Sequence, residues 1–142
     1  MRNLCALLAL LALPLAAEKK AVVPPEFAGG PANYSPGILV DGTLYVSGQI
    51  GQDLKTRQVP ADFETEVKTV LGNIGIVLKA AGMTYQDVVS VQVYLTDMDL
   101  FPQMNAVYVT FLPDPRPSRT TVGVTKLAAP AAHIEITVTA RK

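Results

Sequence analysis

An apolar stripe at helical spacing in residues 63–81 constrains the fold of this chain most. Its members recur every three or four positions and are Phe63, Val67, Val70, Leu71, Ile74, Val77, Leu78 and Ala81. This is the pattern of an amphipathic helix. Asp62 stands before it as an N-cap residue, and Gly82 follows where a left-handed residue ends many helices. Such a helix must bury its apolar face against another layer.

The stretches around this helix alternate with the period of two that is typical of β-strands. Residues 38–40 and 44–47 flank Asp41-Gly42, a dipeptide that accepts the positive φ angles of a tight hairpin turn. Residues 87–95 predict a third strand, whose one face carries Val89, Val91, Val93 and Leu95. Residues 18–30, rich in proline and glycine, predict an extended lead-in.

A second helix is predicted after Asp99, which we take as its N-cap. Its buried stripe consists of Leu100, Met104, Val107, Tyr108 and Phe111, and Pro102 lies in the first turn, where a missing N–H is tolerated. Two more strands follow it. The resulting order ββαβαββ predicts an α+β fold, with one sheet and two helices packed on one face.

The last two predicted strands carry one arginine and one glutamate. Their apolar or β-branched faces consist of Thr120, Val122 and Val124 in the first, and Ile134, Ile136, Val138 and Ala140 in the second. Alternation therefore predicts that Arg119 and Glu135 lie on the opposite face, away from the helices. An arginine beside a carboxylate suits binding a small carboxylate and activating water. A solvated sheet face or a structural ion pair would explain the same pattern.

The first 17 residues have the form of a secretory signal peptide. Arg2 precedes an apolar run rich in Leu and Ala, and Ala16-Ala17 stands before Glu18-Lys19-Lys20. The chain's single cysteine, Cys5, lies in this segment, so the mature chain would lack disulfides and thiolate chemistry. The 12 Lys and Arg balance 12 Asp and Glu, and since residues 1–17 contain only Arg2 of these, the mature net charge is −1.

Several motifs resemble those of the reactive-intermediate deaminase family, called Rid or YjgF and also described as L-PSP endoribonuclease. They are Asn33-Tyr34-Ser35-Pro36-Gly37, Leu44-Tyr45-Val46-Ser47-Gly48-Gln49-Ile50, Val70-Leu71-Gly72-Asn73, Met104-Asn105-Ala106-Val107-Tyr108 and the segment from Pro117 to Glu135. The resemblance covers residues 31–142. It implies a chorismate-mutase-like fold, a homotrimer with clefts between subunits, and hydrolysis of enamines or imines of 2-oxo acids. It implies no metal and no organic cofactor.

The resemblance also implies roles for particular residues. Arg119 would clamp the substrate carboxylate, a task that suits a planar and permanently charged guanidinium. Glu135 would position and deprotonate the attacking water. The remaining substrate-binding positions are Tyr34 at the cleft mouth, Gly48 in a lining turn, Asn105 from the adjacent subunit, and Thr121, where many members have cysteine. Glu66 stands where glutamine is common.

Two other function classes deserve comparison with imine hydrolysis. RNA cleavage requires paired acid and base groups and a basic track, whereas this chain has one histidine and a near-neutral charge. We therefore expect no nucleic-acid partner. A binding module that holds a small carboxylate without turnover is the stronger alternative, because it would share Arg119 with the enzyme and differ only at Glu135.

The signal-peptide pattern predicts an exported protein, periplasmic or secreted, with no membrane attachment after cleavage. The mature chain should begin near Glu18, because small residues precede that position. Intact-mass measurement of the protein from its native source tests this expectation. A soluble cytoplasmic product that retains Arg2 would contradict it.

Overall fold

The computed structural model describes residues 18–30 and 33–142, so the predicted signal peptide lies outside the described residues. The strands are β1 (Lys20–Val22), β2 (Gly37–Val40), β3 (Thr43–Ile50), β4 (Val88–Leu95), β5 (Ser118–Gly123) and β6 (Ile134–Arg141). The helices are α1 (Phe63–Ala80) and α2 (Phe101–Phe111), with 3-10 turns η1 (Pro25–Phe27), η2 (Tyr85–Asp87) and η3 (Met98–Leu100). Within these ranges, no helix has the length and apolar character that crossing a membrane requires.

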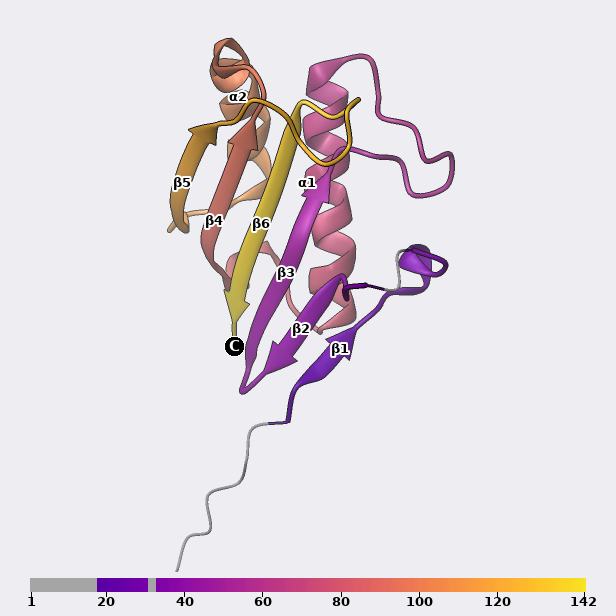
Figure 1. Ribbon diagram of the computed structural model, residues 1–142. Helices are drawn as coiled ribbons and strands as arrows, with labels where there is room; N and C mark the ends of the chain where they lie inside the picture. The colour runs from indigo at the N-terminus through magenta and orange to yellow at the C-terminus, as the bar shows by residue number, and fades with distance from the viewer. Residues whose placement is uncertain (1–17, 31–32) are drawn as a thin grey trace, which may run out of the picture.

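One mixed sheet and two helices make up the fold. The strands lie in the order β1-β2-β3-β6-β4-β5, and both helices lie behind the sheet in Figure 1. Neighbours pair antiparallel except β4 and β5, which are parallel. The predicted α+β class, with helices on one face, is therefore confirmed. The other face of the sheet is left uncovered by helices.

Local sequence signals set the ends of α1 and the first hairpin as predicted. The Asp62 carboxylate accepts a hydrogen bond from the Thr65 N–H at 2.8 Å, and Gly82 adopts a φ of +69° after the helix. Asp41 and Gly42 both have positive φ angles, 47° and 69°, in the turn between β2 and β3. The stripe of α1 is buried against the sheet except at its last member, Ala81, which is partly exposed, and Val67, Val70, Ile74 and Val77 are all at 0% exposure.

Three local predictions need correction. The lead-in contains β1, which pairs with β2 as an edge strand and buries Val22. Asp99 caps no helix, because the Asp97 carboxylate accepts the Asp99 N–H at 2.8 Å and caps η3, which runs directly into α2. Val89 is 49% exposed, since the pairing of β4 with β6 shifts register between Val88 and Ser90 and turns Val89 away from the core.

A buried carboxylate ties α1 to the start of β6. Glu66, at 0% exposure, accepts hydrogen bonds from the backbone N–H groups of His133 at 2.7 Å and Ile134 at 3.3 Å. Its second oxygen lies 2.8 Å from the His133 Nδ1 atom. Gly51 lies against Glu66 so closely that an added Cβ would come 2.5 Å from the Glu66 carbonyl oxygen. One side chain thus fixes where β6 begins.

Replacing Glu66 should destabilise the fold strongly. We expect Glu66→Ala to lower the free energy of unfolding by about 3 kcal/mol, because it leaves two buried backbone donors without an acceptor. Glu66→Gln should lose less stability, since its amide oxygen can still accept both backbone hydrogen bonds, which go to one carboxylate oxygen in the wild type. Urea unfolding of the purified variants measures both changes.

Glu64→Ala provides the matched control. Glu64 lies on the same helix and pairs with Lys68 at the surface, with half of its side chain exposed. Such an exposed ion pair contributes little to the free energy of unfolding. If Glu66→Ala lowered the free energy of unfolding no more than Glu64→Ala does, the hydrogen bonds of Glu66 would make no net contribution to stability.

Candidate functional site

Glu135 lies on the open face of the sheet, in a pocket at the end of β3. This pocket has a volume of about 440 Å³ and is lined by Tyr34, Ser47, Gly48, Ile50, Ala128, Ala129 and Glu135. Gly48 lies where the β3–β6 register shifts, and a Cβ built there would come 2.0 Å from a Glu135 carboxylate oxygen. A larger residue at position 48 would therefore displace this carboxylate from its observed position. The structure brings together Tyr34, Gly48 and Glu135, three of the residues to which the resemblance gives a place in the cleft.

The surroundings of Glu135 favour its protonated form. Partial burial raises the pKa of this carboxyl above its ordinary value. Desolvation disfavours the charged carboxylate, and within the described ranges no salt bridge to Glu135 offsets it. A carboxylate with a raised pKa and an open pocket in front of it is suited to accept a proton from water.

Arg119 lies in a second group of residues, formed by β5 and α2. Its Nη1 atom donates a hydrogen bond to the Asn105 Oδ1 atom at 2.8 Å. The guanidinium carbon lies 4.6 Å from the ring centre of Tyr108 and 5.5 Å from that of Phe101. These contacts are cation–π interactions, and no carboxylate in the described part of the chain forms a salt bridge with Arg119. Arg119 therefore keeps donors available for an anionic ligand, beside a surface pocket that it lines with Asn105 and Tyr108.

Two hydroxyls close to Arg119 lack partners. The Tyr108 hydroxyl and the Thr121 Oγ1 atom are buried, and neither has a hydrogen-bond partner within residues 18–30 and 33–142. Burial raises the pKa of Tyr108, an effect that the Arg119 charge opposes in part. Tyr108 was predicted only as a member of the buried stripe of its helix. Tyr108 lies three residues after Asn105 on the same side of a helix, and this spacing could have identified it as a neighbour of the candidate site.

Arg119 and Glu135 do not share a face, contrary to the prediction. Arg119 pairs with the buried Val91 of β4, whereas Glu135 pairs with Tyr94, an odd number of residues away on the same strand. Since successive side chains alternate, Arg119 lies on the helix side and Glu135 on the open side. Val122, predicted to be buried, is 41% exposed on the open side.

The reason is that β5 is the edge strand of the sheet. Its residues on the helix side lie next to α2. There the rings of Phe101 and Tyr108 contact the Arg119 guanidinium, so a cation can occupy a position that alternation assigns to an apolar side chain. Asn105 accompanies Arg119, because their hydrogen bond forms within one chain. The structure therefore contains two half-sites on opposite faces of the sheet.

Comparison with known proteins agrees with this fold. A family model described as Endoribonuclease L-PSP matches residues 28–142. A RutC family protein of Sulfurisphaera tokodaii is 43% identical over 110 residues, which cover 77% of this chain and 87% of that protein. The 2-iminobutanoate/2-iminopropanoate deaminase of Rattus norvegicus is 41% identical over 104 residues, 72% of this chain and 75% of the relative.

Comparison with solved structures also finds members of this family. The crystal structure of YyfA from Yersinia pestis, a protein of unknown function in the conserved Rid protein family, superposes with a TM-score of 0.83 at 31% identity. The match covers 88% of this chain and 100% of that one. Together with the family model, which matches far more than half of the sequence, these likenesses establish that the chain belongs to the Rid/YjgF family, whose model is described as Endoribonuclease L-PSP.

Proposed function

We propose that this protein hydrolyses imines and enamines of small 2-oxo acids to the 2-oxo acid and ammonia, in clefts between the subunits of a homotrimer. The observation that carries the proposal is the partly desolvated Glu135 carboxylate, which faces a pocket beside Gly48. Relatives about 40% identical that are named imine deaminases give it further support.

The chemistry requires a base for water and an anchor for the substrate. The imine reacts in its N-protonated form. Glu135 takes a proton from water as the water oxygen bonds to the imine carbon and the C=N π electrons move to nitrogen, which gives a neutral carbinolamine. The protonated carboxyl then gives that proton to the amino nitrogen, and as the C–N bond breaks and the C=O bond forms, ammonia leaves and Glu135 takes the hydroxyl proton, which it releases to solvent. Arg119 binds the substrate carboxylate through paired N–H donors and so holds the imine carbon in position.

The positions of the two half-sites support the shared cleft. Because Arg119 and Glu135 face opposite sides of one sheet, a single chain cannot place both on one small molecule. A second copy that sets its β5 edge against the Glu135 face supplies the missing half. Exposed apolar side chains on the open face, Tyr45 at 52% and Val122 at 41%, provide area for such a contact.

RNA cleavage and passive binding have less support from these residues. The one histidine, His133, is engaged by the buried Glu66, and the charge of the chain is balanced, so neither an acid–base pair nor a basic track is evident among the described residues. Passive binding would leave the raised pKa of Glu135 without a use. We keep export through residues 1–17 as part of the proposal, so the substrate would be an imine present outside the cytoplasm.

Single substitutions in the two half-sites should have different effects. Arg119→Ala should abolish binding of 2-oxobutanoate and turnover together, because the carboxylate loses its cationic partner. Glu135→Gln should retain binding but lose roughly a hundredfold or more in kcat, the usual scale for a general base. Calorimetry with 2-oxobutanoate and ammonia release from freshly made 2-iminobutanoate measure both, with Arg141→Ala as the control for loss of an exposed arginine. Binding by the wild type without ammonia release above the buffer rate would leave only the binding module.

Mixing these two inactive variants tests the shared cleft. If each cleft takes Arg119 from one chain and Glu135 from another, every trimer that contains both variants has one intact cleft, so the mixed trimers should regain about a third of their clefts. The variants are co-expressed with different tags and purified through both. Mixed assemblies that stay inactive while retaining their fold would contradict a site built from two chains.

The pH dependence should follow the raised pKa of Glu135. The base must be unprotonated, so kcat/KM should fall on the acid side at a pH above 4.5, the ordinary value for this carboxyl. The same shift predicts a stability effect of defined sign. Folding favours the protonated form, so the charged carboxylate opposes folding at neutral pH and ceases to do so as the pH falls below 4.5. Glu135→Gln should therefore unfold at the same or a higher temperature than the wild type at pH 7. A lower one would contradict the burial of this charge.

A further inference from the structure

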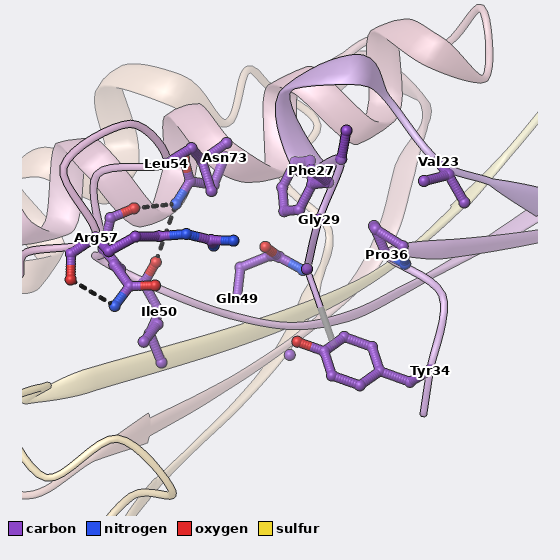
Figure 2. Close-up of a pocket in the computed structure, with 14 residues that line it drawn as sticks. Val23, Phe27, Gly29, Tyr34, Pro36, Gln49, Ile50, Leu54, Arg57 and Asn73 are labelled. Carbon is purple, nitrogen blue, oxygen red and sulfur yellow. Dashed lines mark hydrogen bonds between the residues drawn. The ribbon is translucent and has the colours of Figure 1, made fainter. Parts of the chain in front are cut away.

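Another pocket, next to that of Glu135, lies between the N-terminal segment and the loop that joins β3 to α1 (Figure 2). Its volume is about 420 Å³. Val23, Phe27 and Leu54 provide apolar walls, while Gln49, Asn73 and Arg57 provide the polar groups. In Figure 2 the Arg57 side chain extends into the space between Asn73 and Gln49.

The loop holds Arg57 in an unusual conformation. Its φ is +61°, in the left-handed region that L-residues seldom adopt. The Asp53 carboxylate accepts the N–H groups of Lys55 and Thr56, and the Asp53 carbonyl accepts that of Arg57 at 2.9 Å. The Gln52 side chain donates to the Arg57 carbonyl at 2.8 Å. The loop thus enforces a backbone conformation that glycine would adopt more easily, yet the residue there carries a long cationic side chain.

The charge of Arg57 has no counterpart in the pocket. Its guanidinium has no ion-pair or hydrogen-bond partner in the described part of the chain, and neither Asp nor Glu is among the lining residues. The Asn73 amide is already engaged, because it donates to the carbonyls of Ile50 at 3.1 Å and Gln52 at 2.9 Å. An uncompensated guanidinium at one end of a pocket with apolar walls suits a ligand group that has a short hydrocarbon stem and an anionic end.

This pocket joins the pocket of Glu135. Tyr34, Gly48 and Ile50 line both. Gly48 contributes no side chain at the junction, and a Cβ there would meet Glu135 itself. A substrate whose reacting carbon lies at Glu135 can therefore extend past Gly48 toward Arg57.

We propose that this pocket receives the side chain of the substrate and that Arg57 binds a second anionic group at its end. The preferred substrates are then imines of 2-oxo dicarboxylic acids, and Arg57 is a specificity-determining residue. The inference rests on the proposed imine hydrolysis for its chemistry, and on the pocket alone for the second anion site.

The test compares two substrates of equal chain length that differ only in the terminal group. These are 2-iminoglutarate, which ends in a carboxylate, and 2-iminopentanoate, which ends in a methyl group. The wild type should have the higher kcat/KM for 2-iminoglutarate. Arg57→Gly should lower that value roughly tenfold or more, the scale of one lost charge-assisted contact, and change the value for 2-iminopentanoate less than about twofold.

Arg57→Gly is chosen because it should fold. Glycine accepts a φ of +61° without strain, so the midpoint of thermal unfolding should not fall. Lys55→Ala is the matched control, since it removes a cation from the same loop outside the pocket lining and should leave the preference between the two imines unchanged.

The failure of this inference can be distinguished from the failure of the proposed function. If Arg57→Gly hydrolyses both imines in the wild-type ratio, the second anion site is wrong while the deaminase stands. If the wild type hydrolyses neither imine, the proposed deaminase activity is wrong. Calorimetry with 2-oxoglutarate and 2-oxopentanoate then tests by binding alone whether the pocket has a second anion site. Affinity for 2-oxoglutarate that exceeds that for 2-oxopentanoate and is lost in Arg57→Gly supports the site, and any other result overturns it.

Discussion

The burial of α1 against one face of the sheet is the constraint on which the rest of the structure depends. The centre of its stripe is entirely removed from solvent, with Val67, Val70, Ile74 and Val77 at 0% exposure, as are the facing residues Leu44, Ile134 and Ile136 of the strands. Because strand side chains alternate, this packing sends every second residue of β3 and β6 to the uncovered face. Glu135 lies between Ile134 and Ile136 and so cannot enter the core without turning both isoleucines out. The position of Glu135 is thus a consequence of how the core is packed.

The local parts of this fold could be predicted from the sequence, and the parts set by tertiary position could not. Asp62, Gly82 and Asp41-Gly42 each act within a few residues, and each lies where its pattern indicated. The face of Arg119 was predicted wrongly, because alternation shows that two sets of residues face opposite ways but not which set meets the helices. That choice depends on β5 being an edge strand beside aromatic residues of α2. Arg57 was missed for a similar reason, since its left-handed backbone is enforced by contacts of Asp53 and Gln52.

The buried Glu66 connects stability to the candidate site. A carboxylate removed from water is costly unless donors surround it, and three donors at the start of β6 do so here, if the His133 ring contributes its Nδ1 proton. The last of these backbone donors, Ile134, immediately precedes Glu135. Gly51, which packs on Glu66, follows Ile50, a residue that pairs with Glu135 across the sheet. The contacts of Glu66 therefore hold both β3 and β6 next to Glu135, and removing them would displace Glu135 as well as destabilise the core.

The separation of Arg119 from Glu135 also changes how assembly and activity are related. If both belonged to one chain, subunit contacts would affect the chemistry only through stability. With one residue on each face, the proposed cleft exists only where two chains meet, so the concentration that sustains assembly also sets the number of clefts. Arg57 and Glu135 differ in this respect, because their pockets join within one chain at Gly48. In the proposed mechanism a single chain would therefore retain Arg57 and Glu135, and would depend on its neighbour for Arg119, which binds the first carboxylate.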